Sequence, residues 1–205
     1  MKLWWVRIVA KLVLSRLPFH YREWAKIGLF KHGAMDDYLY AWNVLKTHSS
    51  CLDIKEEWRG LELGPGDSLL SSLLAPALGS EGLTLVDVGD FANKDVNFYR
   101  ERIDRFLLNF TEVALPKVMF DSDINDMLSS VNGGYYSKGL MSLRVLKTSS
   151  YDLIYSQAVL EHLRLDEFET VGTVLFDRPG DVGQVPFLRV GKGGFIGLID
   201  LFDRL

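Results

Sequence analysis

Two glycines and two acidic side chains are spaced so that they could hold a ligand. Gly64 and Gly66 follow the apolar segment Leu61–Leu63, and glycine lets a backbone turn sharply and approach a ligand closely because it has no Cβ. Glu62, two residues before the first glycine, can accept hydrogen bonds from an ammonium or a hydroxyl group. Asp87, 23 residues beyond Gly64, can bind both hydroxyls of a ribose through its paired oxygens. Helix capping is the alternative role for this aspartate.

These residues need a strand, a turn and a helix to bring them together. We predict a strand that ends at Leu63, a glycine turn, and a helix over Leu69–Leu78. Free N–H groups at the start of that helix would favour an anionic or polar ligand group. The apolar run from Gly82, closed by acid at Asp90, is typical of a second strand with Asp87 near its tip. Together these segments indicate a βαβ unit.

The rest of the chain continues this alternation of helices and strands. Amphipathic spacing predicts a helix over Lys94–Phe110 and a shorter one over Asp123–Val131. Tyr135-Tyr136 is the best candidate for a third strand, and a fourth begins after Tyr151. The segment Leu140–Leu146 is apolar-periodic but too short to assign.

Composition limits the class of protein. With 205 residues, 48% hydrophobic and 24% charged, the chain is long enough for a substantial core and is globular. Its net charge of −4 offers no electrostatic footprint for nucleic acid. The single cysteine, Cys51, excludes an internal disulfide framework and fits a reducing, cytoplasmic compartment. The histidines in the first fifty residues, His20, His32 and His48, lack metal-ligand spacing, so we expect no metal site and solvated rings.

Residues 1–50 form a helical extension before the glycine turn. Met1–Pro18 is apolar with a polar stripe at Arg7, Lys11 and Ser15, and the run is too short and too charged to span a bilayer. It either packs on the domain or lies on a membrane surface through residues 1–17. A second helix should start at Asp36 and Asp37.

The segment Glu62–Ser68 resembles the first motif of class I S-adenosylmethionine (SAM)-dependent methyltransferases, E-x-G-x-G-x-[GS]. The dinucleotide fingerprint G-x-G-x-x-G would need glycine where this chain has Leu69, which disfavours a nicotinamide-dependent oxidoreductase. The resemblance implies that Glu62 supports the methionine end of SAM and that Gly64 and Gly66 let the cofactor lie against the turn. It also implies that helices before this motif act as a lid; a satellite core on the sheet is the alternative.

A second block, Tyr151–Leu163, resembles the fourth motif of the same family. The resemblance covers residues 61–165 and implies that Ser156 and Gln157, at the end of the strand, face the cofactor. His162 is the best candidate for a catalytic base, since its ring titrates near neutral pH and lies just past the strand. A histidine on a helix surface is the alternative.

The resemblance weakens after Thr170. Seven of the 18 glycines fall between Gly172 and Gly197, and this load disfavours a helix over 171–183. The family pattern returns near Arg189–Ile196, with a fifth strand expected over Phe195–Leu201. A sheet ending there would present an unpaired apolar edge, which favours self-association and suggests a truncated or locally frame-shifted chain.

The sequence therefore predicts an α/β protein with the Rossmann-like, doubly wound sheet of SAM methyltransferases, incomplete at its C-terminal strands. The expected division is a helical extension or lid over residues 1–50 and a SAM-binding domain over 51–205, atypical from 170 onward. The expected activity is methyl transfer from SAM to a small-molecule acceptor, which could be linked to a lipid or a saccharide. The alternative is a degenerate protein of the same fold that binds SAM, or nothing, without turnover.

Overall fold

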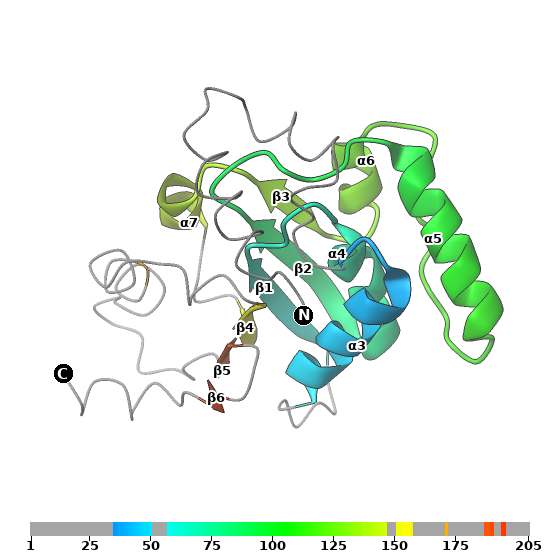
Figure 1. Ribbon diagram of the computed structural model, residues 1–205, viewed down its shortest axis with the longest axis horizontal. Helices are drawn as coiled ribbons and strands as arrows, with labels where there is room; N and C mark the ends of the chain where they lie inside the picture. Colours follow the sequence, from blue (N-terminus) through cyan, green and yellow to red (C-terminus); the bar gives the residue numbers. More distant parts are fainter. Residues whose placement is uncertain are drawn as a thin grey trace, which may run out of the picture. The chain divides into compact units, whose positions relative to one another are not determined.

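A six-stranded sheet forms the centre of the part of the chain that the structure describes. The computed structural model describes residues 35–50, 57–146, 151–157, 171, 187–190 and 194–195, all within one compact unit of residues 33–205. The strands lie side by side in the order β3-β2-β1-β4-β5-β6 (Figure 1). Their bounds are β1 (Trp58–Leu63), β2 (Ser80–Val86), β3 (Gly134–Tyr136), β4 (Leu153–Ser156), β5 (Phe187–Val190) and β6 (Gly194–Phe195).

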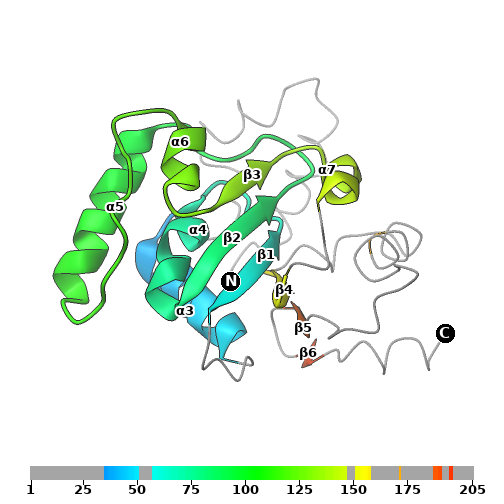
Figure 2. The same ribbon diagram turned by 180° about the vertical axis from the view of Figure 1, so that it is seen from behind.

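Helices pack on both faces of this sheet. They are α3 (Tyr38–Ser49), α4 (Leu70–Leu74) with the 3-10 helix η1 (Ala75–Leu78), α5 (Val96–Asn109), α6 (Ile124–Ser129) and α7 (Leu140–Val145). On one face of the sheet, side chains of α3, α4, α5 and α6 form the larger hydrophobic core. On the other face, Leu143 of α7 packs in a smaller core with the strand residues Leu61, Leu63 and Ile154. Helix α3 lies in front of the sheet in Figure 1 and behind it in Figure 2.

The strand order and direction define a Rossmann-like α/β fold. Strands β1 to β5 are parallel, and the chain moves outward from β1 to β3 before it crosses to β4 on the other side. This is the doubly wound arrangement predicted from the sequence, which is thereby confirmed. The predicted strands before the glycine turn, at Tyr135-Tyr136 and after Tyr151 are also confirmed.

The C-terminal part of the sheet differs from the expectation. The fifth strand was expected over Phe195–Leu201, but β5 occupies Phe187–Val190. Strand β6 then returns antiparallel, with Arg189 opposite Phe195 and Val190 opposite Gly194. Gly194 and Phe195 therefore pair with the fifth strand instead of belonging to it, and β5 is not the edge of the sheet.

Helix α3 belongs to the core of the domain. Asp37 caps it, since its Oδ1 accepts hydrogen bonds from the backbone N–H groups of Leu39 (2.8 Å) and Tyr40 (3.0 Å). This confirms the predicted helix start. Trp42 then packs edge-on against Phe106 of α5, with ring centroids 5.0 Å apart.

Several sequence predictions fall outside the described residues. They concern the N-terminal helix Met1–Pro18, Cys51, the helix that carries His162, the glycine-rich stretch after Val171 and residues 196–201.

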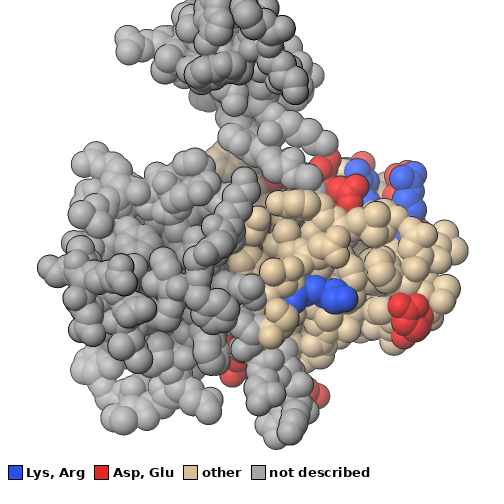
Figure 3. Space-filling view, turned by 60° about the horizontal axis from the view of Figure 1, so that its bottom comes forward, with Lys and Arg blue, Asp and Glu red and all other residues tan. Residues whose placement is uncertain are grey.

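None of the helices in the described ranges has the length and apolar character that a membrane span requires. On the face shown in Figure 3, acidic and basic side chains of the described residues are mixed, with uncharged surface between them.

The packing of α3 on α5 predicts a large effect for Phe106→Ala. Phe106 is fully buried and also lies 4.8 Å from the ring of Phe110. Its truncation should lower the free energy of unfolding by about 3–5 kcal/mol in urea denaturation. The matched control is Leu108→Ala on the exposed side of the same helix, which should change it by less than about 0.5 kcal/mol. Equal losses in both variants would contradict this packing.

Candidate active site

The register of the sheet aligns the carboxyl ends of its parallel strands. Leu63 of β1 pairs with Val86 of β2 on one side and with Ser156 of β4 on the other. The next residue along each strand is therefore Gly64, Asp87 or Gln157, and these three follow neighbouring strand ends. The sheet brings together predicted site residues that are up to 93 positions apart in the chain.

This edge includes the point where the strand order reverses. Strand β1 lies between β2 and β4, and the chain leaves β1 toward β2 first and reaches β4 only after β3. The chain therefore reverses its direction across the sheet at β1, which is the topological switch point of an open α/β sheet. In open α/β sheets ligands bind at this position, so the glycine turn and Gln157 lie where a ligand site is expected.

The glycine turn after β1 requires both of its glycines. Gly64 has φ 75° and Gly66 has φ 70°, in the left-handed region that other residues adopt only with strain. A Cβ built on Gly66 has no atom within 4 Å, so the backbone conformation, and not crowding, demands glycine there. Both glycines are half-buried, and the space beside the Cα of Gly66 is open.

The turn does not offer the free N–H groups that the sequence suggested. Gly64 N–H donates to the carbonyl of Val86 (2.8 Å), and Gly66 N–H donates to Asp87 Oδ2 (3.0 Å). At the start of α4, Leu69 N–H donates to the hydroxyl of Tyr99, and Leu70 N–H to Ser68 Oγ. The expectation of a helix terminus ready for an anion is wrong at these positions, because protein acceptors occupy their donors.

Hydrogen bonds to Asp87 hold the glycine turn against the end of β2. Its Oδ2 accepts from Gly66 and its Oδ1 accepts from the N–H of Val88 at 2.7 Å. Burial raises the pKa of this carboxyl, and hydrogen bonds from Gly66, Val88 and Gly89 partly offset that rise. A carboxylate has about four acceptor sites, so it can still accept hydrogen bonds from a ligand.

Tyr135 of β3 holds the loop that follows Asp87. Its hydroxyl donates to the carbonyl of Gly89 (2.9 Å) and accepts from the N–H of Phe91 (3.2 Å). Burial raises the pKa of this hydroxyl to about 12, so it remains a donor at neutral pH. Lys94 Nζ lies 4.7 Å from the centre of the Tyr135 ring and also pairs with Asp90. The loop beside Asp87 is thus held by Tyr135 of β3 and by Lys94 of the loop itself.

Glu62 lies in the interior, under the turn. It is fully buried, and its Oε2 accepts hydrogen bonds from Ser71 of α4 and from the hydroxyl of Tyr155 in β4 (3.0 Å). Its Oε1 has no hydrogen-bond partner among the described residues. Burial raises the pKa of Glu62 from its ordinary 4.5 to about 7, although both hydroxyl donors favour the charged form.

The end of β4 places its two predicted site residues on different sides. Ser156 is fully buried, and its Oγ has no partner within the described part of the chain. Gln157 is half-buried and binds α3, since its Oε1 lies 3.1 Å from His48 Nε2. His162, the candidate base, lies outside the described residues.

His48 is not solvated, which corrects the sequence prediction. It is 2% exposed, and its ring stacks on that of Tyr155 with centroids 4.6 Å apart. No pattern in the sequence indicated that His48, Tyr155 and Ser71 contact the predicted site residues. The only signal in the sequence was the position of His48 near the apolar face of a helix, which does not identify its partner. In the described ranges, His, Cys, Asp and Glu side chains form no group of three that could hold a metal ion.

Two methyltransferase domains are similar in structure to this chain. The methyltransferase domain of bacterial-CtHen1-CN aligns with 70% of the chain at 20% sequence identity and a TM-score of 0.39. The methyltransferase domain of bacterial-CtHen1-C aligns with 69% at 21% identity and a TM-score of 0.39. The alignments cover 61% and 60% of those two proteins, so this chain spans less than two thirds of their length. No family model and no curated protein matches the sequence.

The raised pKa of Glu62 predicts how stability depends on pH. The folded state keeps the proton up to about pH 7, whereas the unfolded chain loses it near 4.5. The free energy of unfolding should therefore fall by about 3 kcal/mol as pH rises across this window. Glu62→Gln should remove that fall, as measured by urea denaturation at several pH values.

Glu101→Gln, on the exposed side of α5, is the matched control for the loss of one carboxyl group. A Glu62→Gln variant with the same pH slope as the unmodified chain would show that Glu62 is not protonated in the folded state.

Proposed function

We propose that this chain binds SAM at the carboxyl edge of β1, β2 and β4 and transfers its methyl group to a small-molecule acceptor. The observation that carries the proposal is the junction of the glycine turn and Asp87. There the main chain of Gly66, with open space where a Cβ would lie, is hydrogen-bonded to a carboxylate with unused acceptor capacity. The first-motif pattern Glu62–Ser68 spans the end of β1 and this turn, and the described part of the fourth-motif pattern includes β4.

The residues at this edge suit the parts of SAM. Asp87 can accept hydrogen bonds from the two ribose hydroxyls, and the turn at Gly64 and Gly66 lets the cofactor approach the main chain. Gln157 would contact the cofactor from the end of β4. When bound, SAM supplies an electrophilic methyl group on a sulfonium. The chain's contribution is to position the reactants, to exclude water and, through a base such as His162, to accept a proton from the acceptor.

Two observations argue against a dinucleotide cofactor. A pyrophosphate needs several free N–H donors at the turn and the start of the helix, and the donors of Gly64, Gly66, Leu69 and Leu70 are occupied. Leu69, where the dinucleotide fingerprint has its third glycine, is fully buried in the core. The site therefore favours a nucleoside with a neutral or cationic attachment over a diphosphate.

A protein of this fold without turnover is the second candidate. The observation that favours it is the internal engagement of Glu62, whose Oε2 binds Ser71 and Tyr155 beneath the turn. In this arrangement the methionine end of SAM gains no direct contact with that oxygen. The chain would then still bind SAM, but it would not hold the methyl group of SAM in the position that transfer requires.

Calorimetric titration with SAM tests the cofactor. The chain should bind SAM with a micromolar dissociation constant and should not bind NADH. Asp87→Ala should weaken SAM binding by roughly 100-fold, since it removes a charged acceptor of two hydrogen bonds. Asp87→Asn, which keeps one acceptor oxygen, should show an intermediate loss.

Asp90→Ala is the matched control, because Asp90 is an exposed carboxylate in the same loop. It should leave SAM binding unchanged. A folded chain that does not bind SAM would overturn the proposal. Transfer of a radiolabelled methyl group from SAM to a small-molecule cell extract then separates an active enzyme from a protein that binds without turnover.

A further inference from the structure

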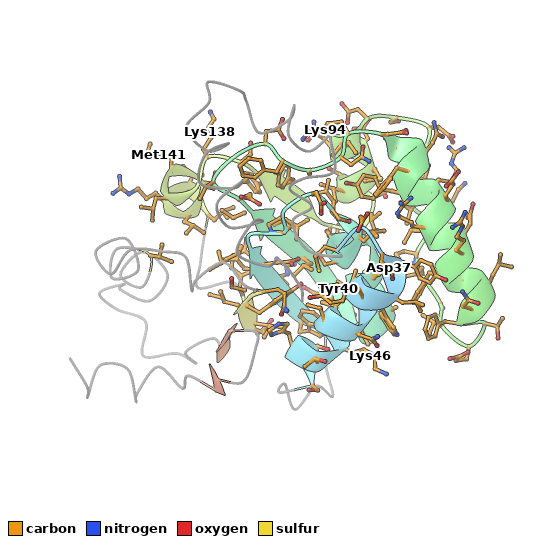
Figure 4. All side chains as sticks on the ribbon, viewed as in Figure 1. Asp37, Tyr40, Lys46, Lys94, Lys138 and Met141 are labelled. Atoms are coloured by element: carbon orange, nitrogen blue, oxygen red, sulfur yellow. The ribbon has the colours of Figure 1, made fainter. Side chains whose placement is uncertain are left out.

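One side-chain amide connects α3 to the end of β4. Gln157 Oε1 lies 3.1 Å from His48 Nε2, and Gln157 Nε2 lies 3.4 Å from the hydroxyl oxygen of Tyr40. Both partners belong to α3, where Figure 4 labels Tyr40 near the N-terminal end. The two ends of a single carboxamide are thus held by one helix, more than a hundred residues away in sequence.

The chemistry of the groups fixes the direction of these hydrogen bonds. A carboxamide oxygen only accepts, so His48 must donate through its Nε2–H. The carboxamide nitrogen only donates, so the Tyr40 oxygen accepts from Gln157 and its own hydrogen points elsewhere. Stacking on Tyr155 holds the plane of the His48 ring while it donates.

This arrangement leaves two donors available at the edge of the sheet. Gln157 has a second N–H hydrogen, and Tyr40 has its O–H hydrogen; within the described residues, the side-chain hydrogen bonds of these two groups are those to His48 and to each other, which use neither hydrogen. Tyr40 is 37% exposed and Gln157 is half-buried, so a ligand can reach both. Two adjacent uncharged donors suit a group with two acceptor oxygens and no hydrogen to donate, which is a carboxylate.

We propose that His48 is a positioning residue that turns the Gln157 amide so that Gln157 and Tyr40 together bind a ligand carboxylate. Without the His48 donor, the amide would be free to rotate and could present its oxygen, which repels a carboxylate. The inference rests on the proposed function for the identity of the ligand, whose carboxylate is that of the methionine part of SAM. His48 itself touches no ligand and acts through Gln157.

A double-mutant cycle on SAM binding tests the coupling between the two residues. His48→Phe keeps a ring that can stack on Tyr155 but removes the donor, and Gln157→Leu removes the amide. Each should weaken SAM binding about fivefold to tenfold, and the double variant should be no weaker than Gln157→Leu alone. Ser49→Ala is the matched control, because Ser49 is buried in the same turn of α3 and bonds only within it. Additive losses would overturn the positioning role.

Decarboxylated SAM tests the group that the donor pair binds. Because it lacks the carboxylate, its affinity should be the same for the unmodified chain, His48→Phe and Gln157→Leu. An equal loss for SAM and its decarboxylated analogue in Gln157→Leu would overturn the carboxylate assignment.

A measurement without ligand separates this inference from the proposed function. ¹⁵N NMR of the free chain should show the Nε2–H tautomer of His48, and the side-chain amide signals of Gln157 should move in His48→Phe but not in Ser49→Ala. Unmoved Gln157 signals would overturn the inference even if SAM binds. Signals that move in a chain that binds no SAM would keep the positioning of Gln157 and overturn the proposed function together with the carboxylate assignment.

Discussion

The parallel register of β2, β1 and β4 is the constraint on which the candidate site depends. Because Leu63 pairs with both Val86 and Ser156, the three strands end in the same row. The residues that follow the three strands, Gly64, Asp87 and Gln157, therefore all lie at the carboxyl edge of the sheet. A slip of one residue in either pairing would turn every side chain of the slipped strand to the opposite face. It would also separate Asp87 or Gln157 from the glycine turn.

The two carboxylates near this edge, Asp87 and Glu62, have different roles because their burial and hydrogen bonding differ. Asp87 lies after its strand, and burial raises the pKa of its carboxyl, but both oxygens accept backbone N–H groups that hold the turn and partly offset that rise. Glu62 lies within its strand, where the sheet and α4 exclude water. Only hydroxyl groups reach one of its oxygens, and its pKa rises to about 7. Asp87 is therefore suited to bind a ligand, whereas Glu62 couples β1 to α4 and β4.

The elements that could be predicted from the sequence are those with strong local patterns. Alternating or continuous apolar runs identified β1, β2 and β4, and the aspartate at position 37 marked the start of α3. The prediction placed the fifth strand wrongly because the sequence has two apolar segments, around 188 and 196, with the glycine-rich residues 191–194 between them. Either could be the parallel strand, and only pairing with β4 decides between them. Likewise, no local pattern shows that His48 faces Tyr155 and Gln157, since these contacts come from the way α3 packs across the sheet.

The internal hydrogen bonds of the turn also determine which ligand chemistry the edge favours. A glycine turn at the end of a first strand is compatible with phosphate binding as long as its N–H groups stay free. Here Asp87 accepts a hydrogen bond from the N–H of Gly66, and the hydroxyl of Tyr99 accepts one from the N–H of Leu69. A carboxylate and a hydroxyl oxygen therefore already occupy N–H groups that a phosphate would use. An anion at this place would meet a carboxylate and lose affinity. Hydroxyl donors on a ligand, such as those of the ribose in the proposed cofactor, would instead find acceptor oxygens at Asp87.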